Sequence, residues 1–229
     1  MCAQERIALY GGTFDPVHAG HLEVARRVSK LFEIEKVLFI PAQMAPHKIG
    51  RPVTEPIHRY AMLALATQDD PQLSISTFEL DAPDRRYTVD TVGHFQRALG
   101  DSTELFFIMG ADSWSEITTW REWERLLSMT NHIVVTRPGY EPVTTHVGAI
   151  SERVVDVRGS DVPLLSSAAH ARKIYFTDVV MKDISATNIR RLASEGRTAE
   201  LTGLVPGPVL EYIKKYGIYR ELNEAKLNS

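Results

Sequence analysis

The sequence has little of what marks secreted, membrane-spanning or nucleic-acid-coating proteins. It contains one cysteine, so an internal disulfide is excluded and a reducing compartment is expected. No stretch approaches the roughly 18–20 apolar residues of a membrane span, and residues 1–6 show no signal-peptide pattern. Basic and acidic side chains number 26 and 29, a net charge of -3, whereas a nucleic-acid coat would be basic. We therefore expect a cytoplasmic protein with neither a membrane nor a nucleic acid as its partner.

The chain does have enough apolar residues to fill a sizeable core. Apolar residues make up 44% of the 229 positions, an ordinary fraction for a globular protein. At about 150 residues per domain this length fits one enlarged domain. Because we find no internal repeat and no low-complexity linker, the sequence predicts a single domain over residues 1–229.

Short apolar runs typical of buried strands alternate with amphipathic helical stretches. Strands are predicted over residues 6–10, 36–40, 73–76, 104–109, 132–136 and 174–176, and helices over 18–33, 59–67, 88–99, 121–129, 186–195 and 208–215. This alternation predicts an α/β fold, a doubly wound parallel sheet of Rossmann-like type, with a helical C-terminal part at about residues 184–220. Residues 140–172 show little periodicity, and no element is predicted there.

A segment rich in glycine and histidine follows the first predicted strand, Gly11-Gly12-Thr13-Phe14-Asp15-Pro16-Val17-His18-Ala19-Gly20-His21. It lies at a strand-to-helix turn, where open α/β sheets bind ligands. Its glycines permit close approach of a ligand, and unpaired N–H groups at the helix start would attract phosphate. His18 and His21 share one face of the first helical turn, and both can donate to phosphate oxygens. Each histidine alone fits an ordinary helix start, whereas the combination predicts a phosphate site.

A second candidate segment lies about 165 residues further on, Ile184-Ser185-Ala186-Thr187-Asn188-Ile189-Arg190. Hydroxyl groups at a helix start can cap the helix or bind an anion. Taken alone, Ser185 and Thr187 fit plain caps, and Arg190 fits a solvated side chain. The first segment is neither the Gly-x-Gly-x-x-Gly fingerprint nor a P-loop, because its glycine spacing differs and no Gly-Lys-Ser/Thr follows.

The first segment resembles the signature of the nucleotidylyltransferase superfamily, Gly-Thr-Phe-Asp-Pro-x-His-x-Gly-His, and the second resembles its Ile-Ser-x-Thr-x-x-Arg motif. Over nearly the whole chain the sequence is most similar to the bacterial nicotinate-nucleotide adenylyltransferase family. The intervening matches are Pro46-His47-Lys48, Arg86-Tyr87-Thr88, Gly110-Ala111-Asp112-Ser113, Thr119-Trp120 and Arg137-Pro138-Gly139-Tyr140. Arg86 and Ala186 depart from the family pattern, and residues 141–172 match it poorly.

The resemblance implies transfer of the adenylyl group of ATP to nicotinate mononucleotide, which gives nicotinate adenine dinucleotide and pyrophosphate in NAD biosynthesis. A phosphate monoester is mostly a dianion at pH 7 and is already a nucleophile, so no general base is expected. The reaction instead needs alignment of two anions and neutralisation of their charge. Mg²⁺ is expected to bind through the ATP phosphates and water, with no metal ligand supplied directly by the protein.

The resemblance also assigns roles to individual residues. Catalysis falls to four basic side chains, with His21 at the reacting α-phosphate and Arg190 at the β- and γ-phosphates: His18, His21, Lys48 and Arg190. The residues assigned to ATP are Gly11, Gly12, Thr13, Phe14, Gly110, Asp112, Ser185 and Thr187. Those assigned to the mononucleotide, with Trp120 stacking on the pyridine ring, are Tyr87, Thr88, Trp120, His47 and Arg137. Arg59 is a further, weaker candidate for the acceptor phosphate.

Other functions stay open at this point. The acceptor could be nicotinamide mononucleotide, or the site could take both mononucleotides. A phosphopantetheine adenylyltransferase would typically be shorter and lack the segment with Trp120. A regulatory module that binds nucleotides without turnover is the alternative outside enzymes, and it would not need intact His18, His21 and Arg190. The sequence leaves a homo-oligomer open.

Overall fold

The computed structural model describes residues 4–43, 53–81, 87–136, 141, 143–160, 163, 172–179 and 184–220. These residues form a seven-stranded sheet with the strand order β3-β2-β1-β4-β5-β7-β6, and every pair of neighbouring strands is parallel. The strands are β1 (Glu5–Gly12), β2 (Lys36–Pro41), β3 (Leu73–Ile75), β4 (Thr103–Gly110), β5 (Asn131–Val135), β6 (Val154–Asp156) and β7 (Ile174–Thr177). The predicted doubly wound parallel sheet is confirmed.

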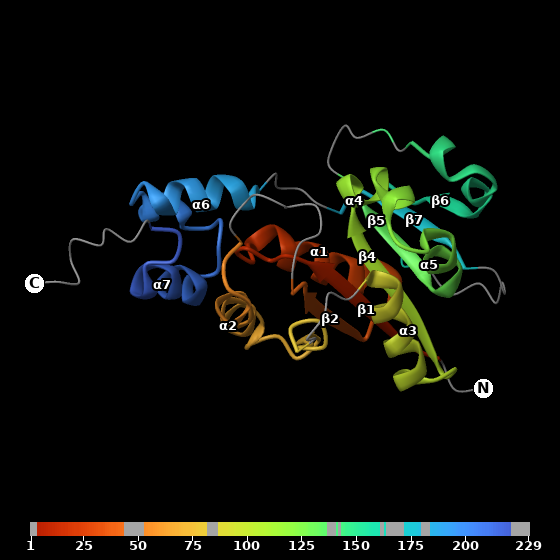
Figure 1. The fold of residues 1–229 in the computed structure, drawn as a ribbon, viewed down its shortest axis with the longest axis horizontal. Coiled ribbons are helices and arrows are strands. Elements are labelled where there is room, and N and C mark those ends of the chain that lie inside the picture. The colour runs from red at the N-terminus through yellow and green to blue at the C-terminus, as the bar shows by residue number, and fades with distance from the viewer. Residues whose placement is uncertain are drawn as a thin grey trace, which may run out of the picture.

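Helices cover both faces of this sheet. They are α1 (Ala19–Phe32), α2 (Pro56–Thr67), α3 (Thr88–Leu99), α4 (Ala111–Ser115), α5 (Trp123–Met129), α6 (Ala186–Ser194) and α7 (Gly207–Tyr216), with 3-10 helices η2 (Ile117–Thr119), η3 (Thr145–Arg153) and η4 (Thr198–Leu201). Figure 1 shows α2, α6 and α7 gathered at one end of the molecule and α4 and α5 at the other. In the part of the chain described above, no helix has both the length and the apolar character needed to cross a membrane.

Each face of the sheet packs into its own hydrophobic cluster. The first, which we call the α1 cluster, joins one side of the sheet to α1, α2, α6 and α7. The second, the α3 cluster, joins the other side to α3, α4, α5, η2 and η3. Successive residues of β1 alternate between them, because side chains along a strand point to opposite faces: Ala8 and Tyr10 lie in the α1 cluster, Ile7 and Leu9 in the α3 cluster.

The boundaries of the predicted elements are close to those observed. The predicted helix over residues 88–99 coincides with α3, and α2 begins three residues earlier than predicted, at Pro56. Proline suits this position because its missing N–H is one that the first turn of a helix leaves unused. The elements α4, β6, η2 and η4 are too short to show a hydrophobic period, so the sequence does not predict them. The nine-residue η3 lies in the stretch that shows little periodicity.

The chain reverses its winding direction between β1 and β4. β1 leads through α1 to β2 on one side, whereas β4 leads through α4 and α5 to β5 on the other. Tyr10 pairs with Ile108 in this central strand pair, so Gly12 and Gly110, each two residues further along, end adjacent strands. Open α/β sheets bind ligands in the crevice at such a reversal. The candidate site therefore lies beyond Gly12 and Gly110.

A buried histidine in β5 predicts how acid affects the fold. The side chain of His132 is fully buried, and burial lowers its pKa from 6.5 to about 3. The unfolded chain therefore takes up a proton on this histidine below pH 6.5, while the folded chain stays neutral until about pH 3. Stability then falls as the pH falls, with a limiting slope of about 1.4 kcal/mol per pH unit from this group.

We expect His132→Phe to remove that slope. Urea unfolding at a series of pH values from 7 to 4 would measure the free energy of unfolding of both proteins. The absolute stability of the variant is not decisive, because it also loses the hydrogen bond between His132 Nδ1 and the Thr130 carbonyl. Equal pH slopes in the two proteins would contradict the prediction.

Candidate active site

The loop after β1 folds back tightly over the end of the strand. Phe14 adopts the left-handed conformation, with φ at 50°, and its ring is buried against Tyr10 and His21, with ring centroids 5.5 Å and 5.0 Å apart. A Cβ on Gly12 would lie 2.8 Å from the Phe14 ring, closer than real contacts allow. Glycine at position 12 therefore leaves room for the Phe14 ring to pack against the start of α1. This packing holds His21 next to the loop.

The two motif histidines lie together at the start of α1. His18 precedes the helix as its N-cap, and its ring stacks on the ring of His21 with centroids 3.7 Å apart. The His18 backbone N–H donates to Nδ1 of His21 at 3.2 Å. Because Nδ1 is the acceptor, the ring proton of neutral His21 lies on Nε2. His21 is thus held in the tautomer that can donate a hydrogen bond from Nε2.

One expectation about the helix start is wrong in part. The N–H of Ala19 donates to the Leu204 carbonyl at 2.8 Å, and the N–H of His21 donates to the His18 carbonyl at 3.0 Å. These two first-turn groups are therefore engaged within the protein and are not the unpaired donors expected at this position. The imidazoles of His18 and His21 remain the candidate donors to an anion at this helix start.

Arg59 supports the loop from α2 and does not contact the solvent. Its side chain is fully buried and donates to the carbonyl groups of Thr54 at 2.8 Å, Thr13 at 2.9 Å and Gln43 at 3.3 Å. The suggestion that Arg59 binds the acceptor phosphate is wrong, because no ligand can reach a guanidinium group enclosed in this way. Arg59 instead fixes the backbone of Thr13.

Arg190 connects the second motif to the first. Its Nη1 donates to the Asp15 carbonyl at 2.6 Å across 175 residues of sequence, and its Nη2 donates to Oγ1 of Thr187 at 3.1 Å. Ser185 caps α6, since its Oγ accepts from the Asn188 N–H at 3.4 Å. The structure therefore brings Arg190 and Thr187 to the loop that carries Thr13 and Phe14, as expected if both motifs bind one triphosphate.

The end of β4 supplies the third predicted segment. Gly110 is exposed and precedes α4, and Asp112 lies exposed in the first turn of that short helix. Trp114 is fully buried, and its indole N–H donates to the Val143 carbonyl at 2.9 Å, so it belongs to the core. Gly110 and Asp112 remain next to the end of β1, where ATP is predicted to bind.

Tyr87 and Trp120, two of the residues predicted to bind the mononucleotide, lie on the opposite face of the sheet from the loop. Tyr87 precedes α3, Thr88 is its first residue, and the Arg121 guanidinium lies 4.7 Å from the centroid of the Tyr87 ring. Tyr87 and Trp120 both pack against the α3 cluster, whereas Phe14 belongs to the α1 cluster. Three predicted site residues lie outside the described part of the chain: His47, Lys48 and Arg137.

A family model described as cytidylyltransferase-like matches residues 9–192, from within β1 to the last turn of α6. The chain belongs to the cytidylyltransferase-like family. The match includes both motif segments and the ends of β1 and β4, which form the candidate site described above.

This cytidylyltransferase-like chain has similar curated relatives over almost its full length. A protein of Thermoanaerobacter sp. (strain X514), named probable nicotinate-nucleotide adenylyltransferase, is 39% identical over 219 residues, which cover 96% of each chain. A protein of the same name from Thermus thermophilus is 38% identical over 94% of this chain and 100% of its own.

Solved structures share the fold of this cytidylyltransferase-like chain. The Plasmodium falciparum nicotinic acid mononucleotide adenylyltransferase complexed with NaAD superposes with a TM-score of 0.70, at 19% identity over 94% of this chain and 97% of that one. The same enzyme complexed with APC gives a TM-score of 0.68 at 20% identity. At this level of identity the likeness concerns the fold.

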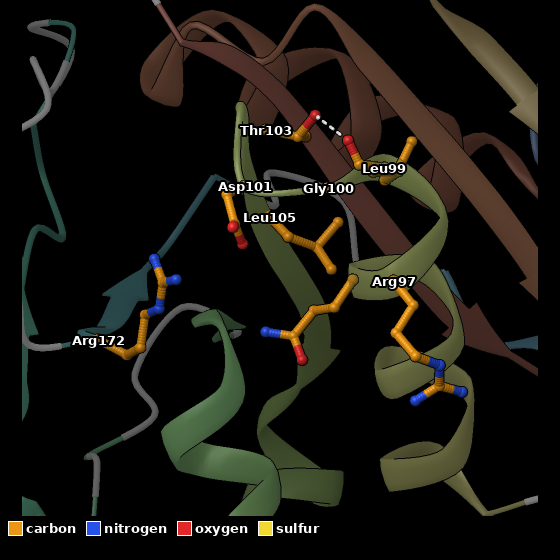
Figure 2. Close-up of a pocket in the computed structure, with 8 residues that line it drawn as sticks. Arg97, Leu99, Gly100, Asp101, Thr103, Leu105 and Arg172 are labelled. Atoms are coloured by element: carbon orange, nitrogen blue, oxygen red, sulfur yellow. Dashed lines mark hydrogen bonds between the residues drawn. The ribbon is translucent and has the colours of Figure 1, made fainter.

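A cavity of about 550 Å³ lies away from the candidate site, at the other end of β4. Figure 2 shows it bordered by the end of α3 and the start of β4, with Arg172 on a separate segment. The described residues that line it are Gln96, Arg97, Leu99, Gly100, Asp101, Thr103, Leu105 and Arg172. None of these eight is a predicted site residue, so this cavity plays no part in the candidate site.

Two glycines of the candidate site predict different effects of an added methyl group on stability. In Gly12→Ala the new Cβ would meet the Phe14 ring at 2.8 Å, so we expect a loss of about 1–3 kcal/mol in the free energy of unfolding. In Gly110→Ala the new Cβ meets nothing within 4 Å, so stability should stay within about 0.5 kcal/mol of wild type. If ATP contacts Gly110, that variant should still bind ATP more weakly. Denaturant unfolding and calorimetric titration with ATP would measure both effects, and a destabilised Gly110→Ala protein would contradict the prediction.

Proposed function

We propose that this chain transfers the adenylyl group of ATP to nicotinate mononucleotide, releasing pyrophosphate. The observation that carries the proposal is the contact between Arg190 and the Asp15 carbonyl, which joins the two motifs around the stacked rings of His18 and His21. The relatives that are 38–39% identical over nearly the whole chain, and are named for this activity, support the choice of substrates.

The residues around the loop suit in-line attack by one phosphate on another. The mononucleotide phosphate is the nucleophile, and its oxygen bonds to the α-phosphorus of ATP as the bond to the bridging oxygen of pyrophosphate breaks. His21, donating from Nε2, would stabilise the charge that develops on the α-phosphate. Arg190 would hold the departing β- and γ-phosphates with donors that its contacts to Asp15 and Thr187 do not use.

The two nucleotides would approach from opposite faces of the sheet. The proposed ATP side contains the loop, Gly110 and the start of α6, and the proposed mononucleotide side contains Tyr87, Thr88 and Trp120. This arrangement would hold the two phosphates together beyond the C-terminal ends of β1 and β4. Fixed positioning of two reactants lowers the activation free energy by up to about 7–11 kcal/mol in favourable cases.

Mg²⁺ would enter this site together with ATP. Among the residues that the structure describes, no group of three or more His, Cys, Asp or Glu side chains is placed to hold a metal ion. The exposed carboxylate of Asp112, at the end of β4, fits a contact to a metal-bound water or to the adenosine ribose. When bound, the ion would neutralise charge on the triphosphate.

The C-terminal helices belong in this proposal to the same domain as the sheet. The α1 cluster contains Val209 and Ile213 of α7 together with Tyr10 of β1 and Leu22 of α1. This shared core supports one domain over residues 1–229.

A competition assay tests the proposed reaction. The protein is incubated with ATP, Mg²⁺ and equal concentrations of nicotinate and nicotinamide mononucleotides, and the dinucleotides are identified by mass spectrometry. We expect nicotinate adenine dinucleotide to dominate. A dominant nicotinamide product would overturn the acceptor, and binding of ATP without any dinucleotide would favour a regulatory module.

A further inference from the structure

After α7 the chain turns back toward the loop between β1 and α1 (residues 13–18), which we call the phosphate loop. Gly217, with φ at 60°, ends this helix, and the Ile218 N–H donates to the Ile213 carbonyl at 3.1 Å. This left-handed glycine cap with a following apolar residue is a common helix ending. Ile218 is buried in the α1 cluster together with residues of α2, α6 and α7, the helices that Figure 1 shows gathered at one end of the molecule.

Tyr219 reaches the first motif from there. Its hydroxyl donates to Oδ1 of Asp15 at 2.7 Å, across 204 residues of sequence. Its backbone has φ at 73°, a strained conformation that a bulky residue rarely adopts and that surrounding contacts must maintain. Burial and the neighbouring Asp15 carboxylate raise the pKa of the Tyr219 hydroxyl, which therefore stays protonated and able to donate.

Asp15 accepts hydrogen bonds through both oxygens of its side chain and through its backbone carbonyl. Its side chain is buried, and while Oδ1 accepts from Tyr219, Oδ2 accepts from the Thr54 N–H at 3.2 Å. Its backbone carbonyl accepts from Arg190 at 2.6 Å. The carboxylate that Tyr219 binds and the carbonyl that Arg190 binds thus belong to one residue, so a shift of Asp15 would move the anchor point of Arg190.

We infer that Tyr219 is a positioning residue for ATP, which acts by holding Asp15 and thereby orienting Arg190 and the phosphate loop. The inference rests on the proposed function, because it assigns the loop and Arg190 to the triphosphate. It concerns the ATP side alone, since Tyr87 and Trp120 pack against the α3 cluster on the other face. A purely structural tyrosine would affect both substrates, or stability only.

Kinetics of Tyr219→Phe separate these two roles. This variant keeps the ring and removes the donor, and loss of one hydrogen bond to a charged group corresponds to about a tenfold effect. We expect kcat/KM for ATP to fall about tenfold, with KM for the mononucleotide within twofold of wild type. Tyr216→Phe is the matched control: Tyr216 ends α7 and is 54% exposed, so its variant should match wild type in both constants.

Direct ATP binding keeps this test independent of the acceptor. Calorimetric titration with ATP and Mg²⁺, without mononucleotide, should show weaker binding by Tyr219→Phe than by wild type even if the wild-type protein makes no dinucleotide. Asp15→Asn provides a second route should Tyr219→Phe fold poorly, because it leaves an acceptor in place but removes the charge that Tyr219 binds. In the double variant we expect no further loss beyond the larger single effect.

Three results would overturn the inference. The first is wild-type ATP affinity and kinetics in folded Tyr219→Phe or Asp15→Asn protein. The second is an equal loss for both substrates, and the third is fully additive effects of the two substitutions on kcat/KM for ATP. Circular dichroism and thermal unfolding of each variant establish that the folded proteins are being compared.

Discussion

His21→Ala is expected to lower kcat at least a hundredfold while the protein stays folded. The variant removes the Nε2 donor of His21. The tautomer of this ring is fixed because the His18 N–H donates to its Nδ1 at 3.2 Å. A fixed donor at a position where charge develops costs about a hundredfold to a thousandfold in kcat when it is removed. Single-turnover measurements with saturating ATP and mononucleotide would isolate the chemical step from substrate binding.

His94→Ala is the control for this prediction. His94 is also a half-buried histidine that stacks on an aromatic ring, Phe78, at 3.9 Å, but it lies on α3, outside the loop. Its variant should keep kcat within twofold of wild type. Turnover by His21→Ala within tenfold of wild type, in protein with native circular dichroism, would remove His21 from the catalytic residues.

Local patterns in the sequence were enough to predict most of the fold. The strands alternate with helices whose apolar residues recur every three or four positions, and the helix over residues 88–99 was predicted with its observed bounds. The first motif could be placed because Gly11 and Gly12 end a buried strand and an amphipathic helix begins a few residues later. Each of these signals lies within about fifteen residues, so no tertiary contact is needed to recognise it.

The residues that support the site could not be predicted in this way. Arg59 resembles any arginine near a helix start, because its burial depends on the Thr13 carbonyl 46 residues earlier. The sequence Gly217-Ile218-Tyr219 does indicate a helix ending, yet nothing local indicates that Tyr219 reaches a carboxylate 204 residues away. Three-residue β6 forms only because β7 offers it a parallel partner. In all three cases the observed structure depends on a partner that is distant in the sequence.

Arg190→Ala is expected to lower kcat/KM for ATP at least a hundredfold. The variant loses the proposed clamp on the β- and γ-phosphates and also the contact with the Asp15 carbonyl, so both the ligand and the loop lose a partner. Arg190→Lys should lose about tenfold, because it keeps the charge but not the planar fork that can bridge the loop, Thr187 and phosphate together. Steady-state kinetics with varied ATP would measure both variants.

The neighbouring arginine distinguishes a clamp from a general effect of positive charge. Arg191 lies one residue further along α6 and is exposed, and its guanidinium pairs with Glu195 at 2.8 Å and with Asn188 at 2.9 Å. Arg191→Ala removes the same charge from the same helix, and an exposed pair of this kind contributes about 0–1 kcal/mol to stability. If long-range attraction of ATP were the cause, both alanine variants would lose affinity to a similar extent and the loss would shrink at high salt. A clamp requires that Arg191→Ala stay within twofold of wild type, and that the loss in Arg190→Ala persist at high salt, because it depends on direct hydrogen bonds to phosphate.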